Sequence, residues 1–264
     1  MTIAIALLLS LLPAPQAPPA ARLTDSQVKD LLARVDDDRD RFEDQLDGKV
    51  KHNVLRGPAG EVDVEKFLDD LQENVDKMKG RFENDYSAGS EVATVLRQGS
   101  AVQRFMSTQP PNMKGASEWN RLAGSLNELA VAYGTTFPTP ENGAVRRIGD
   151  HEIAEAASKM ADAADRFRKR LDDSLKLETH IPQASREAAV AEANGLKKDA
   201  DALADRLKDH KPASGEATAL LQRANRIQTT AAKLSLPSSA KDAWMGVLGP
   251  LGTIAQGFNL QPLQ

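Results

Sequence analysis

The sequence predicts an all-α protein made of two tandem antiparallel four-helix bundles that arose by internal duplication. Three observations predict this fold: the composition, the spacing of apolar residues, and a repeat. Of the 264 residues, 41% are hydrophobic but only 4% are aromatic, so the cores must be built mainly from Leu, Ala, Val and Met. An alanine-rich composition favours helices, and no extended run of alternating β-branched residues argues for a sheet.

The repeat has a constant offset of 125 residues and relates 25–134 to 150–259 without a gap. It is clearest where the last predicted helix is laid over residues 117–134. There the offset pairs Trp244 with Trp119, Gly249 with Gly124, Leu251 with Leu126, Ala255 with Ala130, and Phe258 with Tyr133. We therefore interpret the chain as one unit of about 125 residues present twice.

Apolar residues at three- and four-residue spacing predict four helices in the first copy. The first begins at Thr24, where Gln27 completes a capping box, and is expected to continue through Val50 until Gly57 and Pro58 end it. The other three are expected at 64–82, from near Ser90 to before Pro110, and from Ser117 onward.

The second copy repeats the same plan. Its helices are expected from Ile153 to before Pro182, over 189–207, over 220–234, and over 244–258. Pro250 lies inside the last of them, and it predicts a kink or a break because proline removes a helical hydrogen bond. Four amphipathic helices joined by short loops close most simply as an up-down-up-down bundle.

The predicted organisation is a signal peptide at 1–21, a first bundle at 22–136, a linker at 137–149 and a second bundle at 150–264. The apolar run Ile3–Leu12 is uncharged and too short to span a bilayer, as in a signal-peptide core. A frayed apolar end of a cytoplasmic protein is the alternative. Export predicts a periplasmic or secreted location in a bacterial envelope, and Pro138 and Pro140 mark the linker.

Several classes of function find no support in the residues. The net charge of -4 gives nucleic acid no electrostatic reason to bind. The absence of cysteine excludes disulfides and thiol chemistry, and no nucleophile elbow or phosphate-binding glycine loop is present. We therefore expect neither an enzyme nor a cofactor-dependent protein.

Two patterns resemble metal sites only superficially. The run at 36–40 has the aspartate spacing of a calcium loop, but Arg41 stands where that loop requires glycine. A solvated helix face with an Asp37–Arg41 ion pair is the better interpretation. The four histidines are His52, His151, His180 and His210. All fall at predicted helix ends, and only His151 has a carboxylate one turn away, at Glu155. No metal site is predicted.

The final stretch, 242–264, is the most unusual because Asp242 is its only charged side chain. Such a helix is covered by the other copy, by a partner, or by lipid; lipid is disfavoured because the polar face lacks Lys and Arg. The predicted interaction residues are Trp244, Met245, Val247, Leu248, Leu251, Ile254 and Phe258. We expect an exported, non-enzymatic interaction or scaffold module that binds an unknown protein or itself. The alternatives are a carrier of a small molecule, haem or metal in the bundle core, and a lipid-binding bundle.

Overall fold

The structure is a computed structural model that describes residues 22–51, 54–57, 60–82, 86–140, 142–178, 181–233 and 237–261. The predicted signal peptide, His52 and His180 lie outside these residues. The described helices are α1 (Asp25–Gln45), α2 (Gly48–Lys51), α3 (Val64–Arg81), α4 (Gly89–Met106), α5 (Ala116–Ala132), α6 (Asp150–Leu177), α7 (Gln183–Lys208), α8 (Ser214–Lys233) and α9 (Ser238–Gly257). Two short strands, β1 (Val54–Gly57) and β2 (Gly60–Asp63), complete the described elements.

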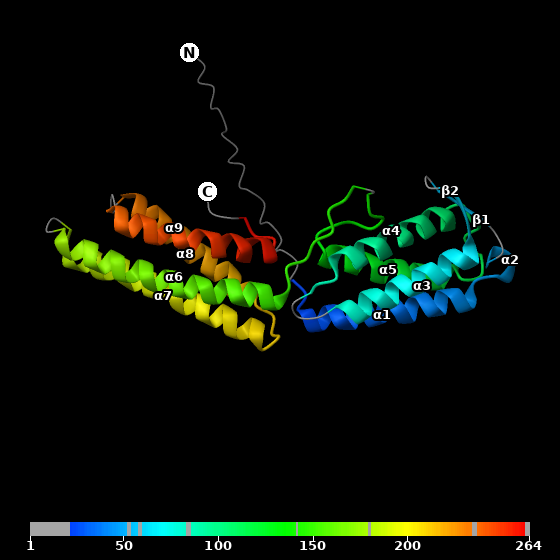
Figure 1. Cartoon of the computed structure of the whole chain (residues 1–264), viewed down its shortest axis with the longest axis horizontal. Helices are drawn as coiled ribbons and strands as arrows, with labels where there is room; N and C mark the ends of the chain where they lie inside the picture. The colour runs from blue at the N-terminus through cyan, green and yellow to red at the C-terminus, as the bar shows by residue number, and fades with distance from the viewer. Residues whose placement is uncertain are drawn as a thin grey trace, which may run out of the picture.

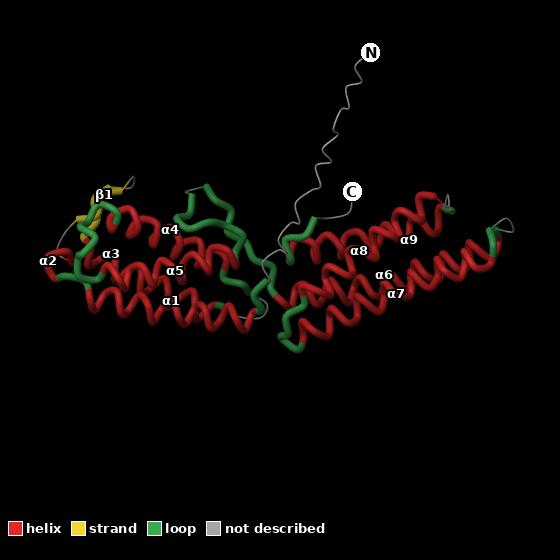
Figure 2. The backbone as a smooth tube through the Cα atoms, turned by 180° about the vertical axis from the view of Figure 1, so that it is seen from behind, coloured by secondary structure: helices red, strands yellow, loops and turns green. Residues whose placement is uncertain are grey.

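The long helices form two groups that lie end to end (Figures 1 and 2). One group contains α1, α3, α4 and α5, and the other contains α6, α7, α8 and α9. Each group encloses its own hydrophobic cluster, and the two clusters have no residue in common. The all-helical class predicted from composition and periodicity is thereby confirmed, apart from the small hairpin. None of the helices in the described ranges has an apolar stretch long enough to cross a bilayer.

The hairpin corrects the prediction that the first helix continues to Gly57. Helix α1 ends at Gln45, and β1 pairs with β2 in antiparallel register with Leu55 opposite Val62. The chain forms the short helix α2 from Gly48, and Val54 and Val62 then favour strands. The hairpin lies at the end of the first group that is distant from the second (Figure 1).

Local sequence explains where α1 and α3 begin. Thr24 and Gln27 form the predicted capping box: the Gln27 amide donates to the Thr24 hydroxyl at 3.2 Å, and the Thr24 amide donates to the Gln27 side chain at 2.8 Å. Asp63 caps α3 by accepting from the Glu65 amide at 2.9 Å. These side chains satisfy first-turn amides that have no partner within the helix.

The same aromatic contact occurs once in each group. Phe42 packs against Trp119 with 5.3 Å between ring centroids and a 59° tilt, and Phe167 packs against Trp244 at 5.0 Å and 57°. Both pairs join the first helix of a group to its last helix. Tilted aromatic pairs of this geometry stabilise a core beyond the area that they bury.

Helix α9 runs continuously through Pro250, so the predicted break does not occur. Proline removes the hydrogen bond to the carbonyl four residues earlier, which belongs to Gly246. Gly246 is exposed, so water can satisfy the freed carbonyl. Five of the alanines of α6 are at most 3% exposed, and their small side chains let neighbouring helices approach closely.

The acidic run of α1 is only partly the solvated face that the sequence predicts. Asp38 is buried and accepts a hydrogen bond from the Ser125 hydroxyl of α5 at 2.7 Å. Arg39 is also buried, and it pairs with Glu43 at 2.8 Å. Arg41 contacts Asp38 at 3.5 Å, one position from the predicted partner Asp37. An aspartate with an internal hydroxyl partner can be buried where apolar periodicity alone would place it outside.

Candidate functional site at the junction of the two halves

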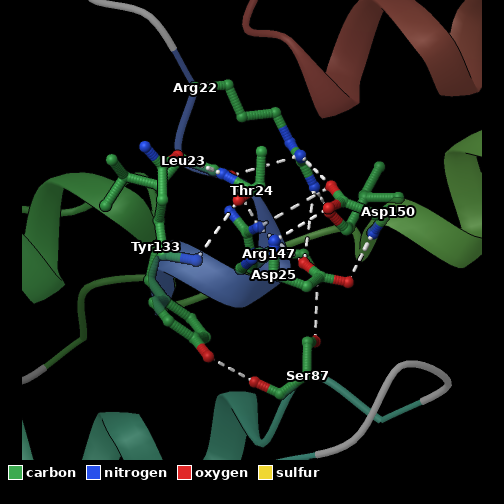
Figure 3. Close-up of polar contacts among 10 residues, drawn as sticks. Arg22, Leu23, Thr24, Asp25, Ser87, Tyr133, Arg147 and Asp150 are labelled. Carbon is green, nitrogen blue, oxygen red and sulfur yellow. Dashed lines mark hydrogen bonds and ion pairs between the residues drawn. The ribbon is translucent and has the colours of Figure 1, made fainter. Parts of the chain in front are cut away.

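The two groups meet where the N-termini of α1 and α6 come together, and each helix caps the other. The Asp25 amide donates to the Asp150 carboxylate at 2.8 Å, and the Asp150 amide donates to the Asp25 carboxylate at 2.7 Å (Figure 3). The α6 N-cap is Gly149, which has no side chain to offer. The carboxylate of Asp25 therefore provides a cap that the local sequence of α6 lacks.

Two arginines complete the junction in the same reciprocal manner (Figure 3). Arg147 donates to the Leu23 carbonyl at 2.8 Å and to the Asp25 carboxylate at 2.6 Å. Arg22 donates to the Ile148 carbonyl at 2.6 Å and to the Asp150 carboxylate. The arginine that precedes each helix thus binds the aspartate that begins the other helix.

Each contact has a counterpart at the 125-residue offset. Arg22 corresponds to Arg147, Leu23 to Ile148, and Asp25 to Asp150. The repeat predicted from the sequence begins at the two aspartates and so leaves out both arginines. Extending the repeat by three more residues toward the N-terminus pairs Arg22 with Arg147. The repeat does not show that each arginine binds the opposite half.

The four charged side chains of the junction are buried, so each needs its oppositely charged partner to be stable there. The side chains of Asp25, Asp150 and Arg147 are at most 3% exposed, and that of Arg22 is 8% exposed. Two helix N-termini that face each other bring together partial positive charges, which the two carboxylates offset. The arginines then balance the carboxylates. A buried charge that keeps its partner is tolerated, whereas one that loses it is strongly destabilising.

Two aromatic residues that are equivalent at the offset, Phe258 and Tyr133, lie near the junction. The Arg22 guanidinium lies 5.5 Å from the centre of the Phe258 ring, a cation–π distance. Tyr133, the counterpart of Phe258, is buried and donates its hydroxyl hydrogen to the Ser87 carbonyl (Figure 3). Burial raises the pKa of the Tyr133 hydroxyl above its usual value of 10.0, although the nearby Arg147 acts in the opposite direction.

Replacing Tyr133 with Phe, the residue at the equivalent position in the second half, should cost about 1–3 kcal/mol of unfolding free energy near neutral pH. The reason is that the partly buried Ser87 carbonyl loses its donor. In the wild type, the unfolded chain ionises this hydroxyl at a lower pH than the folded chain does. Stability therefore falls as the pH rises above about 10. Urea denaturation should therefore show that the difference in unfolding free energy between variant and wild type narrows above about pH 10. A difference in unfolding free energy that stays constant from pH 8 to 11 would contradict this account.

The seven interaction residues predicted on the last helix do not form one surface. Met245 is 65% exposed, and Leu248 is half-buried against the second core. Five are buried in the core of the second half: Trp244, Val247, Leu251, Ile254 and Phe258. The exposed side of α9 is instead formed by Met245, small residues and Gln256. This side has no charge after Asp242.

The histidines form no metal centre with their described neighbours. His151 lies 3.6 Å from Glu155 on an exposed face of α6, an ordinary surface contact. His210 is exposed just beyond the end of α7. Among the residues that the structure describes, no three histidine, aspartate or glutamate side chains are grouped as metal ligands.

A cleft of about 680 Å³ lies beside the junction. Its walls come from the end of α5, the segment that enters α6, and the end of α9, and they include the exposed Val131, Arg146 and Asn259. The four junction charges are already paired with one another. Through these pairs the two halves contact each other directly. No family model, curated protein or solved structure matches the chain.

Proposed function

We propose that this chain is an exported, non-enzymatic scaffold module that holds two like helical bundles in a fixed relative orientation and binds a protein partner or a second copy of itself. The bundles are 22–136 and 150–264, joined by the linker 137–149, and they derive from the duplication of one unit. In support, the aromatic pairs and the junction contacts recur at the 125-residue offset.

Reciprocity at the junction supports the duplication in a specific way. In an interface between two identical subunits related by two-fold symmetry, residue i of one meets residue j of the other, and j meets i. The Arg22–Asp150 and Arg147–Asp25 pairs follow this rule. A single bundle that formed a dimer through this face would leave such a junction after its gene was duplicated in tandem.

The proposed contact surface is the exposed side of α9, and the exposure of Met245 is the observation that carries it. The chain has 27% charged residues, yet this side has none from Met245 onward. The equivalent side of α5 carries Arg121 and Glu128, both exposed. An exposed methionine on an uncharged surface is typical of a protein contact site.

A photo-crosslinking amino acid at position 245 tests this proposal in the native host. The matched control places the same amino acid at Asn120, which is the exposed equivalent of Met245 on α5. Irradiation should give a discrete crosslinked product from position 245 and none from position 120. Equal yields of crosslinked product from both positions, or no product from position 245, would contradict the proposal.

Export is tested separately from binding. The proposed leader ends at residue 21, so the mature chain would begin at Arg22, which the junction requires. Intact mass measurement of protein from the host envelope should show the loss of about 21 residues, the length given by the signal-peptide pattern. Recovery of the full-length mass from the cytoplasm would contradict export.

A further inference from the structure

Helix α9 packs on α6 in the opposite direction. Near one end of the pair the Trp244 ring contacts the Phe167 ring, and near the other end Gly257 lies against Ile153. The middle of α6 therefore lies beside the middle of α9, whose exposed side carries no charge from Met245 onward.

The first half shows which side chains of α6 border this exposed side of α9. One groove between α1 and α5 is lined by side chains of both helices, among them Asp37, Arg41, Asn120 and Gly124. At the 125-residue offset these four correspond to Asp162, Arg166, Met245 and Gly249. By this equivalence, one acidic and one basic residue of α6 border the uncharged side of α9.

An ion pair joins the first and last helices of the first half but not those of the second. Glu128 of α5 pairs with Arg34 of α1 at 2.6 Å. In α9 the place of this glutamate is taken by Thr253. Lys159, the equivalent of Arg34, pairs instead with Glu155 of its own helix at 3.1 Å. The exposed side of α9 thus offers no charge to the side chains of α6.

Asp162 and Arg166 have no ion-pair partner among the residues that the structure describes. Both are exposed, and they lie one turn apart with opposite charges. In a two-fold interface, residue i of one subunit meets residue j of the other, and j meets i. If two copies pack α9 against α9 in opposite directions, with the axis between the levels of these two residues, α6 also faces α6. Each Arg166 then faces the partner's Asp162.

We propose that the exposed side of α9 is the interface of a two-fold dimer of this chain, in which the two α9 helices pack antiparallel and Arg166 of each copy pairs with the partner's Asp162. This inference rests on the proposed function, because it names the partner of the contact surface proposed there. An uncharged side bordered by two opposite charges is matched by its own copy. Symmetry supplies both the uncharged surface and the opposite charge at each place.

Gly246 and Gly249 leave this side of α9 open to the close approach of a second helix. A side-chain carbon placed on either would meet no other atom within 4 Å. Glycine destabilises a helix interior relative to alanine, and no contact within the described chain requires a glycine at either position.

Sedimentation equilibrium of the purified chain tests the dimer. The wild type should associate to a dimer as its concentration rises, and Gly249→Arg should raise the dissociation constant at least about tenfold, because two like charges enter the interface. Gly124→Arg is the matched control: Gly124 is the equivalent residue of α5, is also exposed, and also has open space around it. If Gly249→Arg does not fold, Gly246→Arg replaces it, since it introduces the residue that the first half carries there, Arg121.

Exchanging the two border charges tests the pairing. Asp162→Arg and Arg166→Asp should each raise the dissociation constant by about threefold to tenfold, because like charges then face each other at the edge of the interface. The double variant Asp162→Arg/Arg166→Asp should restore the wild-type value. A double variant that dimerises no better than the single variants would overturn the pairing.

A wild type that stays monomeric, or a dimer that Gly124→Arg weakens as much as Gly249→Arg does, would overturn the inference. Crosslinking at position 245 separates this failure from that of the proposed function. A monomeric chain that still crosslinks there to a different protein overturns the second copy as partner and leaves the contact surface in place. A monomeric chain without crosslinked product contradicts both.

Discussion

The variant Asp25→Ala should lose about 3–5 kcal/mol of unfolding free energy, the range found when one partner of a buried ion pair is removed. Arg147 would remain buried without its carboxylate, and the Asp150 amide would lose its cap. Urea denaturation followed by circular dichroism measures the change. Asp150→Ala should cost a similar amount, because its contacts mirror those of Asp25.

The matched control for this prediction is an exposed ion pair within one half. Arg34 and Glu128 lie 2.6 Å apart with more than half of each side chain exposed. Glu128→Ala should therefore change stability by less than about 1 kcal/mol. A cost for Asp25→Ala as small as that of the control would show that the junction does not hold the halves together. The double variant Asp25→Ala/Asp150→Ala should cost less than the sum of the single variants, since they share partners.

The second large effect is expected at Trp244. Trp244→Ala should cost about 3–5 kcal/mol, because the ring is 8% exposed and packs against Phe167 in the second core. The neighbouring Met245→Ser should cost less than about 0.5 kcal/mol, as is typical of exposed positions. Thermal unfolding of both variants measures the difference. Comparable losses at the two positions would mean that the sides of α9 are assigned incorrectly.

This pair of variants also separates stability from binding on one helix. If Met245 is a contact residue, Met245→Ser weakens the complex and leaves the fold intact. Trp244→Ala would weaken binding only by unfolding the half that carries the surface. With the photo-crosslinking amino acid moved to Gly249, which is also exposed on α9, the melting temperature and the crosslinking yield of each variant distinguish the two cases.

The helices were predictable because their signals are local. Thr24 and Gln27 specify the start of α1, and spacing alone gave α3, α4 and α5 within a few residues. The end of α1 was not predictable from spacing, because Val50 continues the apolar pattern although it lies in the separate short helix α2, after α1 has ended at Gln45. Burial of Asp38 was missed for a related reason: its partner, Ser125, is 87 residues away.

The candidate site was only half accessible from the sequence. The offset that pairs Asp25 with Asp150 was found, but a repeat shows equivalence and not contact. Equivalent residues could instead have made the same contact twice, once within each half. Only the tertiary structure shows that they meet each other. The interaction role of the seven residues predicted on the last helix stays a prediction. An uncharged stretch indicated a contact surface, whereas most of its large side chains were needed to fill the core of their own half.

The central claim, that reciprocal contacts at the junction hold two like halves in a fixed orientation, can be measured as a distance distribution. The chain contains no cysteine, so spin labels at Asn120→Cys and Met245→Cys would report only on these equivalent exposed positions, one in each half. A single narrow distribution is expected, and it should become broad in Asp25→Ala/Asp150→Ala while both halves remain helical. A broad distribution in the wild-type background, or a narrow one that the double substitution leaves unchanged, would contradict the claim.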